Sequence, residues 1–141
     1  MRSFLIFIII IPPYRRIICN NLSYTIIWIN SIFNSAESKG FNLNNLTTSF
    51  TTLESDKAFE LIGILGLYPD AILQAATQRA PHKITNYINN LASAFHSFYN
   101  DEHVVTADQL KSYERLTLLK ATKTVLKDAL KLVGVSAPNK M

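Results

Sequence analysis

The sequence predicts an all-α fold, a bundle of four or more helices. Three observations favour this fold class. Apolar residues recur three or four positions apart in several segments after residue 50, as on one face of a helix. Proline, glycine and asparagine separate these segments. No alternation typical of a strand competes with the helical spacing there. Because amphipathic helices on short loops bury their apolar faces only against one another, we expect a bundle.

The first expected helix is short. It covers residues 32–39 and ends at Gly40, since glycine readily adopts the backbone conformation that closes a helix. An Asn/Thr-rich connector follows over residues 41–50. Thr51 and Glu54 then have the spacing of a capping box, which marks the start of the next helix.

Two helices are expected before Pro81. The first ends at Gly66, and its apolar face has helical spacing. That face is formed by Ala58, Leu61, Ile62 and Leu65. The second helix is shorter, follows Pro69 and stops before Pro81.

The two longest helices come last. One lies between Pro81 and Asn100. Its apolar face is formed by Ile84, Tyr87, Ile88, Leu91, Ala94, Phe95 and Phe98. The other begins near Thr106, where Gln109 stands at capping-box spacing, and runs to Gly134. Its expected buried stripe consists of Leu116, Leu119, Val125 or Leu126, Leu130 and Val133. At ~1.5 Å per residue this helix would be about 40 Å long, enough to cross a small bundle.

The first thirty residues differ in composition from the rest. Arg2 precedes an unbroken apolar run from Phe4 to Ile11, and Arg15 and Arg16 follow it. The run is far too short to span a bilayer as a helix. No cleavage site of the small-x-small kind follows it, which argues against an export signal. Membrane tethering through this run stays a weaker alternative.

Positive charge is concentrated at the C-terminus. The chain has a formal net charge of +4. Residues 111–141 hold seven basic and two acidic residues, whereas residues 53–110 hold three basic and seven acidic ones. A basic segment of this kind suits a polyanionic partner.

The sequence contains no catalytic or metal-binding motif. The single cysteine, Cys19, excludes an intramolecular disulfide and a multi-cysteine zinc site, and favours a reducing compartment such as the cytoplasm. His82, His96 and His103 are not at metal-ligand spacing, so we expect them at the surface or at helix ends. A Gly-rich phosphate loop, a Gly-x-Ser-x-Gly motif and a pair of acids in a plausible cleft are also missing. We therefore expect no catalytic residue, no metal site and no bound cofactor in this chain.

Four lysines of the last expected helix are the main candidates for a binding function. Lys120, Lys123, Lys127 and Lys131 are spaced by three, four and four residues, which places them on one face, opposite the leucine stripe. A solvated polar face explains most such runs. Alternatively, the lysines form a ridge that follows a nucleic-acid backbone and releases its condensed counterions. The spacing alone favours the first interpretation.

Aromatic residues are the second candidate feature. Phe95, Phe98 and Tyr99 lie within five residues near the end of one expected helix, so they point to more than one face. Core packing is the simpler interpretation for Phe98. An aromatic ring at a helix end beside a basic ridge could instead stack on an unpaired base of an RNA loop.

Two parts of the chain resemble a known family. Residues 79–87, Arg-Ala-Pro-His-Lys-Ile-Thr-Asn-Tyr, and residues 91–100, Leu-Ala-Ser-Ala-Phe-His-Ser-Phe-Tyr-Asn, are similar to the central helix of the anticodon-binding domain of arginine–tRNA ligases. Residues 115–141 resemble the last helix and terminus of that domain. Asp-Ala-Leu-Lys at 128–131 is close to the domain's Asp-Ala-Leu-Arg signature, and the chain ends on Ala-Pro-x-Lys/Arg-Met, as family members do. The resemblance covers about residues 28–141.

The resemblance implies both a fold and a function. The fold is a helical bundle of the class I aminoacyl-tRNA synthetase anticodon-binding type, and the partner is the tRNA for arginine rather than DNA or a membrane. Phe95 would lie where the family places an aromatic ring against an anticodon base, and Met141 would approach the same loop. Lys120, Lys123 and Lys127 are our own electrostatic addition to these tRNA-binding residues.

The catalytic parts of the family are absent from the sequence. Full-length members join arginine to its tRNA with ATP and magnesium, in a catalytic domain that carries a His-x-Gly-His motif. This chain contains neither that motif nor a domain of that size. We therefore expect the chain alone to be inactive as a ligase.

The start of the chain departs from the family pattern. Family members open this domain with a helix of the form Tyr-x-x-Tyr-Ala-His-x-Arg, and residues 22–28, Leu-Ser-Tyr-Thr-Ile-Ile-Trp, stand in its place. An aromatic contact from that helix is therefore expected to be missing. The expected organisation is a non-family apolar segment at 1–28 and a truncated anticodon-binding domain at 29–141. One hypothesis is that residues 1–28 are translated from a shifted frame, which the flanking nucleotides would test.

Two other functions stay open. The chain could be a non-catalytic helical interaction protein that docks on a partner through its apolar N-terminus, or a remnant that has lost RNA binding. A tRNA titration at several salt concentrations separates both from anticodon recognition.

Overall fold

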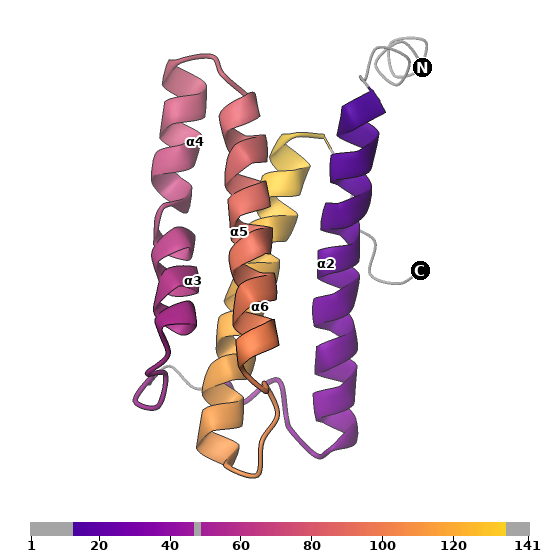
Figure 1. Cartoon of the computed structure of the whole chain (residues 1–141), viewed down its shortest axis with the longest axis vertical. Coiled ribbons are helices and arrows are strands. Elements are labelled where there is room, and N and C mark those ends of the chain that lie inside the picture. The colour runs from indigo at the N-terminus through magenta and orange to yellow at the C-terminus, as the bar shows by residue number, and fades with distance from the viewer. Residues whose placement is uncertain (1–12, 47–48, 135–141) are drawn as a thin grey trace.

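Five helices make up the described part of the chain. The structure is a computed structural model and describes residues 13–46 and 49–134. The helices are α2 (Pro13–Ser38), α3 (Asp56–Gly66), α4 (Tyr68–Thr77), α5 (His82–Asp101) and α6 (Gln109–Leu132) (Figure 1). No strand occurs in the described residues. The predicted all-α fold is confirmed.

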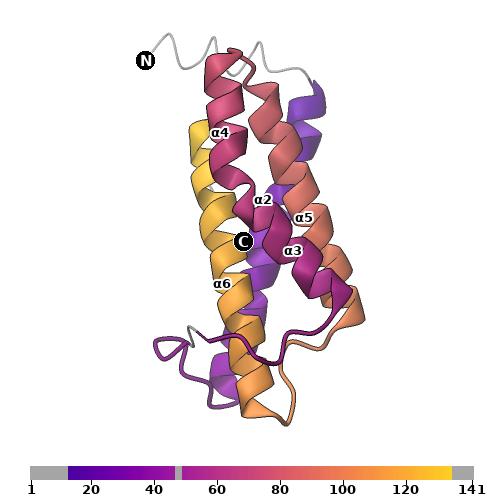
Figure 2. The same cartoon turned by 90° about the vertical axis from the view of Figure 1, so that its left-hand side faces the viewer.

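The helices form a bundle around α5. α3 and α4 follow one another end to end along one side of α5, and α2 lies along its other side (Figure 1). α6 packs against α5, α2 and α3. Figure 2 shows α3 and α4 in front of α5 and α6, with α2 at the back. The core therefore lies between α2, α5 and α6, and the α3–α4 pair covers it from one side.

α2 is much longer than predicted. The expected helix covers residues 32–39, whereas α2 runs from Pro13 to Ser38 without a break. Its buried side chains recur three or four residues apart and are Leu22, Ile26, Ile29, Ile32, Phe33 and Ala36. The sequence concealed this helix because residues 26–29 are apolar on every side. The expected boundary between residues 28 and 29 thus falls inside one helix whose two halves share the core.

The predicted cap of α3 is wrong. Ser55 caps the helix, since its Oγ accepts a hydrogen bond from the N–H of Ala58 at 3.1 Å. Thr51 cannot serve as the cap because its N–H and hydroxyl both donate to Glu114, at 2.8 and 3.2 Å. The contact with Glu114, distant in sequence, therefore prevents Thr51 from acting as the cap that the local spacing predicted.

α6 also begins at a different cap. Asp108, not Thr106, is the cap, and its Oδ1 accepts hydrogen bonds from the N–H groups of Leu110 and Lys111 at 3.0 and 3.3 Å. A carboxylate suits this position because it also meets the positive end of the helix dipole. The N–H of Thr106 donates instead to the hydroxyl of Ser112 at 2.8 Å.

Glycine closes helices where predicted. α3 ends at Gly66, and Gly40 and Gly134 follow α2 and α6 with φ angles of 90° and 80°. These angles lie in the left-handed region that favours glycine.

The long helices bury the predicted faces. In α5 the buried residues include Tyr87, Ile88, Leu91, Ala94, Phe95 and Phe98. In α6 they include Leu116, Leu119, Leu126 and Leu130. Leu126 is therefore buried and Val125 only partly so. α3 differs from its prediction, because Ile62, expected on the buried face, is 40% exposed.

Two tyrosines hold the α3–α4 pair to the rest of the bundle. Tyr68 donates its hydroxyl hydrogen to Asp128 of α6 at 2.5 Å, and Tyr87 of α5 donates to the carbonyl of Ile64 at 2.7 Å. Burial raises the pKa of both phenols, to about 12 for Tyr87, and the Asp128 carboxylate raises that of Tyr68 further. Both tyrosines therefore remain hydrogen-bond donors at neutral pH.

Candidate nucleic-acid interface

A hollow of about 530 Å³ opens between α2 and the end of α5. The α2 side supplies Trp28, Ser31, Ile32, Ser35 and Lys39. The end of α5 and the loop after it supply Tyr99, Asn100, Glu102, His103, Val104 and Val105. Aromatic rings, hydroxyls, an amide and a lysine therefore surround one space. Such a combination can stack on an unpaired nucleobase and hydrogen-bond its edges.

Trp28 is an exposed ring of the hollow. Its indole is 45% exposed and meets the ring of Tyr99 edge to face at 5.4 Å between centroids. It meets His96 in the same way at 5.6 Å. The sequence analysis expected the family's aromatic contact from this helix to be missing, and the structure places the ring of Trp28 in α2 beside α5. One turn earlier, Tyr24 is also 54% exposed.

Phe95 does not reach the surface. Its side chain is 0% exposed, and its ring lies 5.1 Å from that of His96 and 6.1 Å from that of Tyr99. Both faces of the ring are therefore covered by the core. In this conformation Phe95 packs against the half-buried rings of His96 and Tyr99 and offers no free face for stacking.

His96 joins α5 to α2. Its Nε2 lies 3.2 Å from the hydroxyl oxygen of Thr25, and its ring packs on Trp28. Burial lowers the pKa of His96 below 6.5, since the protonated ring would lose hydration there. The expected surface or capping role is wrong for this histidine, which is a neutral link between two helices at neutral pH.

The α6 lysines lie close to one another and to α2. The Nζ of Lys123 stands 5.5 Å from the centre of the Phe33 ring, a cation–π contact with α2. Burial lowers the pKa of Lys123, and the charges of Lys127 and Lys120 lower it further. The structure thus brings Lys120, Lys123 and Lys127 together. Lys123, however, packs against Phe33 of α2 and does not point away from the core.

α2 separates the lysines from the hollow. Trp28, Ser31 and Ser35 line the hollow on the side of α2 that faces the end of α5. Phe33, whose ring contacts the Nζ of Lys123, points to the α6 side. The two candidate surfaces are therefore neighbours across one helix, about 10 Å wide, and do not form a single pocket.

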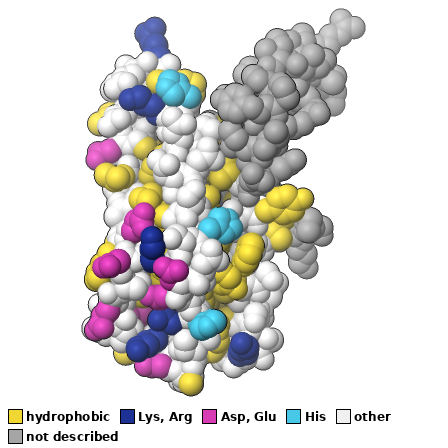
Figure 3. Space-filling model, in the orientation of Figure 1, with side chains coloured by type: hydrophobic (Ala, Val, Ile, Leu, Met, Phe, Trp, Pro, Cys, Tyr) yellow, Lys and Arg dark blue, Asp and Glu magenta, His cyan; other side chains and the backbone are white. Residues whose placement is uncertain are grey.

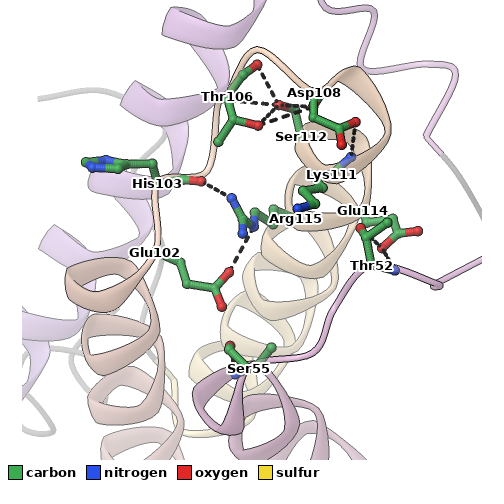
Figure 4. Close-up of polar contacts among 11 residues, drawn as sticks. Thr52, Ser55, Glu102, His103, Thr106, Asp108, Lys111, Ser112, Glu114 and Arg115 are labelled. Atoms are coloured by element: carbon green, nitrogen blue, oxygen red, sulfur yellow. Dashed lines mark hydrogen bonds and ion pairs between the residues drawn. The ribbon is translucent and has the colours of Figure 1, made fainter.

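An ion pair fixes the loop between α5 and α6, whose residues 102–105 line the hollow (Figure 4). Arg115 of α6 places its Nε 2.9 Å from a carboxylate oxygen of Glu102, and its Nη1 donates to the carbonyl of His103 at 2.5 Å. The side chains of Arg115 and Glu102 are only 15% and 13% exposed. Together with the Asp108 cap, these contacts hold residues 102–108 in place against α6.

A second carboxylate, Glu114, anchors the connector before α3. It is 0% exposed, and its two oxygens accept four hydrogen bonds from the N–H groups and hydroxyls of Thr51 and Thr52, at 2.5 to 3.2 Å. Burial alone would raise the pKa of Glu114, but these hydrogen bonds outweigh it and lower the pKa. The sequence analysis missed this residue, although it stands one turn before Leu118 and two turns before Thr122, both buried.

Met141 lies outside the described residues, so its predicted position has no structural counterpart here. Among residues 13–46 and 49–134, no group of three or more His, Cys, Asp or Glu side chains could hold a metal ion. The aromatic hollow and the lysines of α6 are the candidate nucleic-acid contacts in the described residues.

Comparison with known proteins links these features to one family. Residues 22–141 match the family model described as the DALR anticodon binding domain. The chain is similar to the arginine–tRNA ligases of Bacillus pumilus, with 46% identity over 114 residues, and Bacillus subtilis, with 50% over 93 residues. These alignments cover 80% and 65% of this chain but 20% and 17% of the relatives. The chain therefore spans about a fifth of the length of those relatives.

Solved structures agree with this comparison. A Campylobacter jejuni protein described as an arginyl-tRNA synthetase matches with a TM-score of 0.77 and 25% identity, over 88% of this chain and 26% of that one. Thermus thermophilus arginyl-tRNA synthetase matches with a TM-score of 0.71 and 24% identity, over 85% and 20%. The family match begins at residue 22, so it takes in residues 22–28, which the sequence analysis had placed outside the domain.

Proposed function

Because the chain belongs to the DALR anticodon-binding domain family, we propose that it binds the anticodon stem and loop of a tRNA, and that this tRNA is the one for arginine. The observation that carries the proposal is the hollow with Trp28 and Tyr99 at its mouth. Aromatic rings that are partly open to solvent bind unpaired bases by stacking. The identity with arginine–tRNA ligases supports the choice of tRNA.

The hollow would hold one unpaired base. Trp28 would stack on it, and Tyr99 would fix the position of the indole. The hydroxyls of Ser31 and Ser35 and the amide of Asn100 line the same space and offer donors and acceptors for the base edge.

Positive charge on both sides of α2 would hold the phosphates. Lys39 lies at the hollow, and Lys120, Lys123 and Lys127 lie on the α6 side of α2. A strand that crosses α2 would meet both sets. Each phosphate neutralised by a lysine releases a counterion, so binding should weaken steeply as the salt concentration rises.

Two further residues belong to the proposed site. Phe95 would act through its contacts with Tyr99 and His96 rather than by stacking on the base itself. Met141 would approach the same anticodon loop, as the family resemblance implies. Both roles are open to test by substitution.

The proposed role in the wider family is to present arginine tRNA for aminoacylation in the cytoplasm. ATP and magnesium would act in the remaining four-fifths of the relatives' length, which this chain does not span. We propose that the chain by itself does not attach arginine to tRNA.

A tRNA titration tests the proposal. The full chain is titrated with transcripts of an arginine tRNA and of an unrelated tRNA at several salt concentrations, with filter retention as the readout. The fluorescence of Trp28, the only tryptophan in the sequence, provides a second signal that stacking should quench. We expect a preference for the arginine tRNA and a linear fall of log affinity with log salt. Equal, salt-independent binding of both tRNAs would instead favour a protein-interaction role.

A further inference from the structure

Arg115 of α6 binds two neighbouring residues of the loop that lines the hollow. Its Nε lies 2.9 Å from a carboxylate oxygen of Glu102, and its Nη1 donates a hydrogen bond to the carbonyl oxygen of His103 (Figure 4). Both partners line the hollow, whereas Arg115 itself does not. A side chain outside the proposed tRNA site therefore holds one wall of that site.

The wall held by Arg115 carries a negative charge. Among the described residues that line the hollow, Glu102 is the single acidic one, and Lys39 is the single lysine or arginine. A free carboxylate at Glu102 would cancel the charge of Lys39 and repel the phosphates of a bound RNA strand. Binding of RNA in the hollow therefore requires the charge of Glu102 to be neutralised.

The ion pair turns the Glu102 carboxylate away from the hollow. Figure 4 shows the carboxylate directed toward Arg115, between the ends of α5 and α6, while the imidazole of His103 projects to the other side of the loop, toward α2. The Glu102 side chain is only 13% exposed. On the face drawn in Figure 3, acidic side chains gather on the α3 side, and none is visible among the described residues on the α2 side.

The Glu102 carboxylate depends on Arg115 for its position. The Nε of Arg115 and the Oε2 of Glu102 are buried, and apart from one another neither atom has a polar partner among the described residues. Removing one member of a buried ion pair leaves the other charge uncompensated. Without Arg115 the carboxylate would therefore turn toward water, which it can reach in the hollow that Glu102 lines.

A second residue of α6, Ser112, holds the other half of the same loop. Its Oγ accepts a hydrogen bond from the N–H of Thr106 at 2.8 Å and lies 3.1 and 3.0 Å from the carbonyl oxygens of Thr106 and Asp108 (Figure 4). Thr106 and Asp108 do not line the hollow. Arg115 and Ser112 thus both fix the loop, but only Arg115 meets a charge at the hollow.

We propose that Arg115 is a positioning residue of the tRNA site, which holds the Glu102 carboxylate out of the hollow and neutralises it, so that the hollow accepts the phosphates of an RNA strand. This role rests on the proposed tRNA binding and gives Arg115 no contact with RNA. Because the effect is electrostatic, it should be strongest at low salt concentration.

Filter retention of an arginine tRNA transcript by the full chain tests this role. Arg115→Gln should weaken binding by at least about tenfold at low salt, because the freed carboxylate repels phosphates. The loss should shrink as salt screens the repulsion. Adding Glu102→Gln to Arg115→Gln removes the carboxylate and should return the affinity to within about threefold of the natural chain. A double variant that stays as weak as Arg115→Gln would overturn the proposal.

Two control variants separate charge neutralisation from other causes of weak binding. Lys111→Gln removes an equal charge from an exposed residue of α6, and Ser112→Ala loosens the half of the loop outside the hollow. Each should change the affinity by less than about threefold, since neither exposes a carboxylate to the RNA. A tenfold loss in Lys111→Gln would assign the effect to net charge, and the same loss in Ser112→Ala would assign it to loop order; either result would overturn the proposal.

Arg115→Lys is a second test, which also serves if circular dichroism shows that Arg115→Gln does not fold. Lysine keeps a positive charge beside Glu102 but lacks the planar guanidinium that also reaches the His103 carbonyl, so the affinity should stay within about threefold. A tenfold loss in Arg115→Lys would reject charge neutralisation. If the natural chain does not bind the transcript, the proposed function fails together with this role. Binding by the natural chain without rescue by Glu102→Gln rejects the role of Arg115 alone.

Discussion

The two sides of this bundle are built differently. On the side formed by α2, α5 and α6, the largest fully buried side chains gather, among them Phe95, Phe98, Ile26 and Leu119. On the outer side, formed by α3 and α4, Leu61 is the single large side chain in that set, and Phe59, Ile62 and Leu73 face outward. The first side supplies most of the large buried side chains and the proposed tRNA site, and the second packs on α5 mainly through smaller or partly buried side chains. Substitutions should therefore have very different effects on the two sides.

The largest expected effect separates the two sides directly. Phe95→Ala should lower the free energy of unfolding by about 3–5 kcal/mol, because it empties a fully enclosed space. Phe59→Ala, at an aromatic residue of α3 that is 58% exposed, should change it by less than about 0.5 kcal/mol. Urea denaturation followed by circular dichroism measures both. If Phe95→Ala keeps its stability and loses tRNA binding alone, Phe95 is a base-stacking residue and the buried position is wrong.

The next effect concerns Glu114 of α6, which binds Thr51 and Thr52 in the connector before α3. Glu114→Gln should destabilise the chain by about 2–3 kcal/mol, since a neutral amide replaces a carboxylate that receives four hydrogen bonds. Glu60→Gln, which removes an exposed pair with Lys57 at 3.4 Å, should cost less than about 0.5 kcal/mol.

The same residue gives a pH dependence with a defined sign. The pKa of Glu114 is lower in the folded chain than its ordinary 4.5. Its stabilising contribution is therefore complete above pH 4.5 and is lost as the pH falls through the folded pKa. Denaturation midpoints measured at decreasing pH should fall more steeply for the natural chain than for Glu114→Gln. Parallel curves would mean that the carboxylate is not held as described.

A binding measurement then tests whether the side formed by α2, α5 and α6 holds the tRNA site. Trp28→Ala should weaken tRNA binding by about 1–3 kcal/mol, the usual contribution of one stacked base. Phe59→Ala is the matched control, because it removes an exposed aromatic ring outside the hollow, and binding should not change. Filter retention at one fixed salt concentration compares the two. Equal losses for both variants would show that the hollow is not the tRNA site.

The sequence predicted the parts of this molecule that depend on local spacing. The apolar faces of α5 and α6 and the closing glycines follow from residues a turn apart, and they are confirmed. The caps and the start of α2 do not follow from local spacing. Thr51 donates a hydrogen bond to Glu114, 63 residues away, and α2 is apolar on all sides around Trp28. The hollow was unpredictable for the same reason, because its two walls are some seventy residues apart in the chain.

A second pH dependence tests the link between α2 and α5. The pKa of His96 is lowered by burial below 6.5, so below that pH the unfolded chain binds a proton that the folded chain resists. Stability should fall as the pH drops below about 6.5, with a slope of up to ~1.4 kcal/mol per pH unit. His96→Asn should remove this slope, and His82→Asn, at an exposed histidine of α5, should keep it. A slope that survives in His96→Asn would assign it to another group.

The smallest effect concerns the outer side. Gly63→Ala should stabilise the chain by about 0.5–1 kcal/mol, because alanine is the better helix former and its Cβ meets nothing within 4 Å. Urea denaturation compares this variant with the natural chain. A loss of stability in Gly63→Ala would mean that the space at position 63 is not open as described.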